Sequence, residues 1–200
     1  MLWAMSVVMV AAYGSVPQVR TVLDFVADWQ RRYRFLSAFV SFAFFCGILP
    51  GVFLFAVRSI RPERPVLTIV AQTIWNGMFG IATEEVFRLL AVWFGDDASF
   101  RTLVLKTLAD QFVWTVLVVA PVNAVFSFWL GRDLSFARVR REMPRNLVAR
   151  VCLPNLVMNW CVWIPVIFMV FSFPQPLQVF VCGFACAFWS LMCLQIGRRS

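Results

Sequence analysis

The sequence contains no histidine, which removes the commonest metal ligand and the commonest general base from the chain. Its six cysteines stand singly in or beside apolar stretches, without a CxxC pair, and this pattern is typical of small packing residues. We therefore predict no catalytic residues, no metal site and no cofactor, and hence no enzyme.

Charged residues are also scarce, at 14% of the chain, whereas 62% of the residues are hydrophobic. A soluble domain of 200 residues cannot hide so much apolar surface. The apolar runs are continuous rather than alternating, which favours membrane helices over a barrel. The net charge of +8 is nearly all arginine and lies between these runs, where lipid headgroups explain it better than nucleic acid does. Membrane lipids are thus the expected partners, and nucleic acid is excluded.

Runs of about 20 apolar residues are the unit that crosses a bilayer. The predicted spans are residues 35–57, 66–94, 102–130, 153–173 and 177–196, the first with a kink near Pro50-Gly51. Residues 1–16 are a marginal span or an interfacial segment, and residues 18–34 form an amphipathic helix expected on the membrane surface. The fold class is all-α, a polytopic transmembrane helix bundle. Residues 1–64 hold the N-terminal hydrophobic and interfacial helices, and residues 65–200 hold a four-helix transmembrane region.

Arginine is distributed unequally between the predicted loops. The side with residues 58–64, the 132–150 loop and the C-terminus carries 11 basic residues, and the other side carries six. The first side is therefore expected to face the cytoplasm or a matrix-like compartment. A bacterial inner membrane and an organelle membrane, mitochondrial or peroxisomal, both fit.

Polar and small residues form a stripe along the predicted span 66–94. At 100° per residue they occupy an arc of about 160°; they are Gln72, Thr73, Asn76, Gly77, Gly80, Thr83, Glu84 and Arg88. The opposite face carries Ala71, Ile74, Trp75, Met78, Ala82 and Val86. Two interpretations stay open, because such a stripe suits both close helix packing in lipid and the lining of a wet cavity.

Ionisable residues inside a span indicate function when they are partnered. Asp110, followed by Gln111, lies about two turns inside its helix, and we predict Lys106 or Arg88 as its partner. Glu84 and Arg88, four residues apart, are expected to pair. The candidate residues of the pore or polar stripe are Gln72, Asn76, Gly80, Thr83, Glu84, Arg88, Asp110 and Gln111. Glu84-Glu85 with Arg88 is similar to the EExxxR element of CPBP-type intramembrane proteases, but the spacing is one residue short and the histidines of those enzymes are absent.

Several short elements follow one another in the C-terminal part of the chain. They are Lys106 with Asp110-Gln111 at a helix start, Trp163-Ile164-Pro165, Phe173-Pro174 and Trp189, preceded by Pro65, Thr68, Thr73 and Gly77. In this order they resemble the motifs of the Mpv17/PMP22 family of small four-helix membrane proteins, over residues 65–196. The departures are Val116 in place of a proline, Gln178 in place of an arginine, and Leu191-Met192-Cys193 in place of the closing YLS.

The resemblance implies a weakly selective channel for small solutes in an organelle membrane. It would place Asp110-Gln111 at a pore mouth or helix contact, and it would make Trp163, Pro165, Pro174 and Trp189 packing residues. Small solutes are then expected partners, with a second copy of the chain as a further candidate. The alternative is a non-catalytic membrane scaffold or assembly protein, in which the polar stripe packs against another helix.

Overall fold

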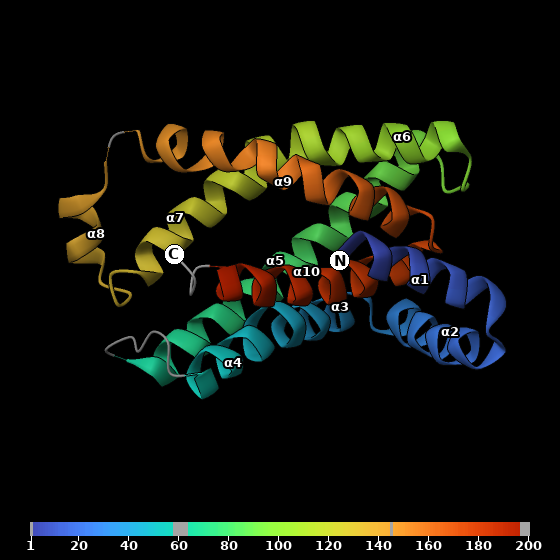
Figure 1. Ribbon diagram of the computed structural model, residues 1–200, viewed down its shortest axis with the longest axis horizontal. Helices are drawn as coiled ribbons and strands as arrows, with labels where there is room; N and C mark the ends of the chain where they lie inside the picture. The colour runs from blue at the N-terminus through green and yellow to red at the C-terminus, as the bar shows by residue number, and fades with distance from the viewer. Residues whose placement is uncertain (1, 58–63, 145, 197–200) are drawn as a thin grey trace.

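The computed structural model describes residues 2–57, 64–144 and 146–196, and these residues form an all-α bundle (Figure 1). Its helices are α1 (Leu2–Ser15), α2 (Pro17–Arg32), α3 (Arg34–Phe42), η1 (Ala43–Ile48), α4 (Leu49–Val57), α5 (Pro65–Phe94), α6 (Phe100–Leu108), η2 (Ala109–Val119), α7 (Ala120–Leu130), α8 (Phe136–Glu142), α9 (Leu147–Phe171) and α10 (Gln175–Ile196). The segments α3–η1–α4 and α6–η2–α7 are each one continuous helix, so the described part holds eight helices.

Three of these helices are long and apolar enough to cross a membrane, namely Arg34–Phe53, Pro65–Phe94 and Phe100–Leu130. Two shorter apolar stretches, Leu156–Phe171 and Gln175–Leu191, follow them. These five helices occupy the positions of the five predicted spans, which confirms the all-α class. By length and composition, the three long helices are candidate membrane spans. The 14-residue α1 is packed against α9 and α2.

The long helices enclose a central space. Helices α6 and α9 run along one side of the bundle, α3, α4 and α10 run along the other, and α5 crosses obliquely between them (Figure 1). Half of the buried apolar core comes from α9 and α10, including Val166, Val170, Leu177 and Val179, and most of the rest comes from α2, α3, α5 and α6.

Two of the spans switch from α-helix to π-helix shortly before a proline. In the first, the Leu49 N–H bonds to the Phe44 carbonyl, five residues back, and Pro50 follows. In the second, the Ala120 N–H bonds to the Thr115 carbonyl, and Pro121 follows. Proline has no N–H, and its ring clashes with the carbonyl four residues earlier, so the preceding turn widens. A kink was predicted near Pro50, and the structure has a π-helical turn just before this proline. The same change of helix type precedes Pro121.

The helix ends separate the connections into two groups (Figure 1). At one end of the bundle lie the end of α4, the start of α5, α8 and the end of α10. At the other end lie the α2–α3, α5–α6 and α9–α10 connections. Arg64, Arg132 and Arg138 belong to the first end, as predicted, while Arg58, Arg61 and the arginines at 145, 198 and 199 lie outside the described residues. The compartment that this arginine-rich end faces stays a prediction.

Hydrogen bonds cap the start of α6 in the connection after Gly95. Ser99 Oγ accepts from the Thr102 N–H at 3.3 Å, and the Asp97 carboxylate accepts from the Ser99 N–H at 3.1 Å and from Thr102 Oγ1 at 2.8 Å. These hydrogen bonds from Ser99 and Thr102 lower the pKa of Asp97.

Loss of this cap is expected to be measurable. Ser99→Ala should lower the free energy of unfolding by about 1 kcal/mol, the usual effect of removing a serine N-cap, whereas Ser15→Ala, at an exposed position of α1, should have little effect. Because the folded pKa of Asp97 is depressed, its contribution is complete above the unfolded value of about 3.9 and is lost as the pH falls through the folded pKa. Thermal unfolding in detergent should therefore separate wild type from Asp97→Asn at pH 7 but not in strong acid. Equal melting of Ser99→Ala and wild type at pH 7 would contradict the capping role.

Candidate functional site: a polar and aromatic central cavity

A cavity of about 420 Å³ lies at the centre of the bundle. Side chains from all five apolar helices line it, including α3–η1, α5, η2–α7, α9 and α10. Of the residues predicted for the pore or polar stripe, five line this cavity: Gln72, Asn76, Thr83, Asp110 and Gln111. Residues up to 148 positions apart in the sequence, from Phe42 to Ser190, thus face one space.

The predicted stripe of α5 divides into two faces. Gln72, Asn76 and Thr83 line the cavity. Gly80 does not, because a Cβ at this position would lie 2.5 Å from the Ala38 carbonyl oxygen and 2.7 Å from Phe42 Cβ. Gly77 lies equally close to the Phe39 ring. The two interpretations of the stripe therefore apply to different edges of the same helix: one edge lines the cavity, and the edge with Gly77 and Gly80 packs against α3.

Trp75 was predicted on the opposite, lipid-facing side of α5 but lines the cavity. Its indole N–H donates to Asn123 Oδ1 at 3.4 Å, and its ring stacks on Phe126 with centroids 4.3 Å apart and planes 1° apart. These contacts join α5 to α7. Ile74 and Met78 do face outward, with more than half of each side chain exposed.

Asp110 and Gln111 are both buried in η2, with 3% and 2% of their surface exposed. Gln111 Nε2 donates to Asp110 Oδ2 at 2.7 Å, and the Trp160 indole N–H of α9 donates to the backbone carbonyl of Gln111 at 3.1 Å. The prediction that Asp110 pairs with Lys106 or Arg88 is wrong, because both cations pair elsewhere. Lys106 instead lies 3.9 Å from Asp96 and over the Phe171 ring, because its side chain leaves the helix toward α9.

Arg88 is the other rejected partner, because it pairs with Glu85 at 2.9 Å. Glu84 was predicted to pair with Arg88 but instead accepts from Gln175 Nε2 at 3.3 Å and lies 4.0 Å from the Arg34 guanidinium. Arg34 also pairs with Glu85. Residues three apart on a helix pair as well as residues four apart, so Arg88 pairs with Glu85. Glu84 faces α3 and α10 instead. This polar network joins α3, α5 and α10 outside the cavity.

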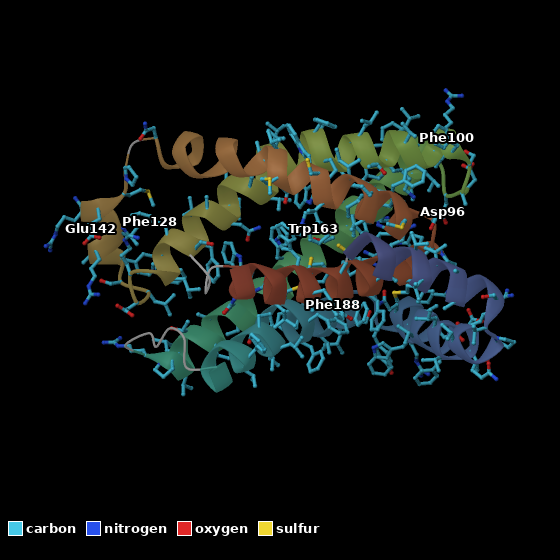
Figure 2. All side chains as sticks on the ribbon, viewed as in Figure 1. Asp96, Phe100, Phe128, Glu142, Trp163 and Phe188 are labelled. Carbon is cyan, nitrogen blue, oxygen red and sulfur yellow. The ribbon has the colours of Figure 1, made fainter. Side chains whose placement is uncertain are left out.

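Aromatic rings form much of the cavity wall. Eight of the lining residues are Phe or Trp. Trp163 of α9 and Trp189 of α10 meet edge to face with centroids 6.3 Å apart, and Figure 2 shows Trp163 midway along the bundle, between the two sides. Of the other residues expected to shape the packing, Pro165 lies inside α9, and Pro174 lies in the turn between α9 and α10. The sequence analysis missed the lining residues Phe79, Trp114 and Phe126. The one feature that could have indicated them is that each lies three or four residues from a polar residue on the same helix face.

The cavity is elongated along the helices. Its lining on α5 runs from Gln72 to Phe87, about 22 Å of helix at 1.5 Å per residue. At one end the lining residue Ser127 is exposed, close to the arginine-rich end of the bundle. At the other end Phe87 is 1% exposed and packs edge to face on Phe171, with centroids 4.9 Å apart. The cavity therefore reaches the surface on one side and is closed by packed side chains on the other.

The cysteines on the wall are Cys46, Cys182 and Cys186. Within residues 2–57, 64–144 and 146–196, no three Cys, Asp or Glu side chains are grouped so that they could hold a metal ion. Among the lining residues, Asp110 is the one Asp, Glu, Lys or Arg.

Comparison of the chain with family models, with curated proteins and with solved structures gives no match. The resemblance to the Mpv17/PMP22 family therefore rests on the sequence motifs alone.

Proposed function

We propose that this membrane protein binds a small solute in the central cavity and passes it across the bilayer as a gated channel or carrier. The observation that carries the proposal is the convergence of polar side chains from three apolar helices on one space: Gln72 and Asn76 from α5, Asp110, Gln111 and Asn123 from α6–η2–α7, and Asn159 from α9. Polar groups inside a bilayer are expensive. Some of these groups hydrogen bond within the bundle, as Gln111 does to Asp110. All of them nevertheless line a cavity within the size range of small-molecule sites, which packing alone does not require.

The gated character follows from the two unlike ends of the cavity. A permanently open pore would have a continuous lining from one membrane surface to the other, but here the packed rings of Phe87 and Phe171 close one end of the cavity. Passage of a solute requires these side chains to move apart. The network of Arg34, Glu84 and Gln175 lies beside Phe87 on α5 and holds three helices together there.

The small residues of α5 favour this function over a scaffold. The stripe would serve assembly if Gly77 and Gly80 offered a surface to another protein. Both instead contact α3 of the same chain, which already covers them. The resemblance to Mpv17/PMP22 proteins supports a solute channel as well, without being needed for the argument.

Cysteine accessibility tests the proposal. In a variant with all six native cysteines replaced by alanine, single cysteines at Gln72 and Asn76 should react with a water-soluble methanethiosulfonate. Matched cysteines at Ile74 and Met78, on the lipid-facing side of the same turns, should not. Because Cys46, Cys182 and Cys186 line the cavity, the cysteine-free protein must first be shown to retain flux.

Flux is measured in proteoliposomes with glycerol, lactate and ethylammonium as neutral, anionic and cationic probes. At least one of them should enter faster than in protein-free liposomes, and modification at Asn76 should slow that entry several-fold, because the added group obstructs a narrow path. Unreactive cysteines at Gln72 and Asn76, in a protein that passes none of the probes, would overturn the proposal in favour of a scaffold.

A further inference from the structure

We infer that the cavity takes a lipophilic primary or secondary ammonium ion, with Asp110 as its counter-charge. The inference rests on the proposed function, since it names the class of solute that the cavity binds.

The charge of the lining is the first observation. Asp110 is a buried lining residue of the cavity, and within the described residues its carboxylate accepts one hydrogen bond, from the neutral Gln111 amide. The nearby cations, Lys106 and Arg88, are engaged with Asp96 and Glu85. A buried carboxylate without a cation carries a large desolvation cost, which a bound cation would offset. An anionic solute would meet repulsion and no positive side chain among the lining residues.

A free hydrogen-bond acceptor lies beside this carboxylate. Gln111 Oε1 is buried and has no hydrogen-bond partner among the residues that the structure describes, although native structures satisfy most such atoms. Its amide nitrogen is already used on Asp110, so the oxygen is left for a donor. Two neighbouring acceptors suit a group with several N–H bonds, which is the chemistry of an ammonium ion rather than of a quaternary one.

The aromatic rings on the cavity wall suit the apolar part of such an ammonium ion. Trp114 lines the cavity one turn after Asp110, and Trp163 and Trp189 meet on the wall formed by α9 and α10. The faces of such rings attract cations and also accept an apolar body. With a volume of about 420 Å³ the cavity has room for an arylalkyl amine.

The experiment compares two probes of one skeleton, phenethylammonium and neutral 2-phenylethanol, by isothermal titration of the full-length protein in detergent, with protein-free micelles subtracted. Wild type should bind the ammonium at least tenfold more tightly than the alcohol. Asp110→Asn should lose at least tenfold in ammonium affinity and bind the alcohol within twofold of wild type. Asp28→Asn, an exposed change on α2, should alter neither affinity.

A second pair of variants keeps the test decisive if Asp110→Asn does not fold. Gln111→Leu should weaken the ammonium several-fold without weakening the alcohol, and Asp110→Glu should keep the preference for the ammonium. Equal affinities for the two probes in wild type, or an unchanged preference in Asp110→Asn or Gln111→Leu, would overturn the inference. If cysteines at Gln72 and Asn76 still react in that case, the solute class is wrong and the proposed function stands; if they do not react, the proposed function itself fails.

Discussion

Replacing Phe87 by alanine is expected to lower the free energy of unfolding by about 3–5 kcal/mol, the usual cost of truncating a buried phenylalanine. The ring is 1% exposed and packs against Phe171, so its removal leaves a void that rigid helices fill poorly. The void would also extend the central cavity toward its closed end. We therefore expect faster passage of any solute that the wild-type protein transports, together with the loss of stability.

Two measurements check this prediction. Unfolding by a denaturing detergent, followed by tryptophan fluorescence, gives the stability, and proteoliposome uptake gives the flux. Phe25→Ala is the matched control, since Phe25 of α2 is 73% exposed and makes no ring contact within the described residues. Unchanged stability would show that the ring is not packed as described, and lower flux in a stable variant would show that Phe87 does not close the pathway.

Replacing Gly80 by valine is expected to destabilise the bundle by about 3 kcal/mol or more, at the upper end of overpacking effects. A single Cβ at this position already comes within 2.5 Å of a backbone oxygen on α3. A carbonyl in a helix cannot rotate away as a flexible side chain can, so α3 and α5 must separate. Since small residues allow the close approach that holds membrane helices together, separation also loses packing along the whole contact.

Gly14→Val is the control for this substitution, because a Cβ at Gly14 meets nothing within 4 Å. The midpoint of thermal unfolding in detergent should fall for Gly80→Val and stay nearly constant for Gly14→Val. An equal effect of the two changes would contradict the close contact between α3 and α5. If Gly80 instead lined the cavity, valine would reduce flux without this loss of stability.

The fold class and the positions of the spans could be predicted because they depend on apolar length, which the sequence displays directly. The π-helical segments were harder to predict. Pro50 marked one of them, but the same signal at Pro121 was not interpreted as a change of helix type. The local effect of a proline depends on whether neighbouring helices fix the widened turn, and the sequence does not show those neighbours.

The candidate site was located only in part, because a helical wheel shows directions but not what lies in each direction. On α5 the cavity residues lie within about 60° of Gln72 on either side, and the glycines that contact α3 lie at about 80–140°. The predicted arc merged these two faces. It also excluded Trp75, at about 300°, because a large aromatic side chain resembles a lipid contact as much as a cavity wall.

The charge partners could not be predicted from spacing along one helix. Glu84 accepts a hydrogen bond from Gln175 and lies near Arg34, both on other helices, and the Lys106 ammonium lies over the Phe171 ring of α9. Long side chains reach whichever helix lies beside them, so their pairing depends on the tertiary arrangement. Asp110 was the informative case, since its position inside a span did indicate a place on the cavity wall even though the partner proposed for it was wrong.

The buried lysine has a consequence for chemical labelling. Lys106 is the one lysine of the whole sequence, and it is 1% exposed beneath Phe171. Reagents that acylate primary amines therefore meet no accessible lysine on the native bundle, and apart from the α-amino group their target appears only when α6 and α9 separate. The rate at which Lys106 is acylated would thus report how often this part of the bundle opens, without any engineered probe.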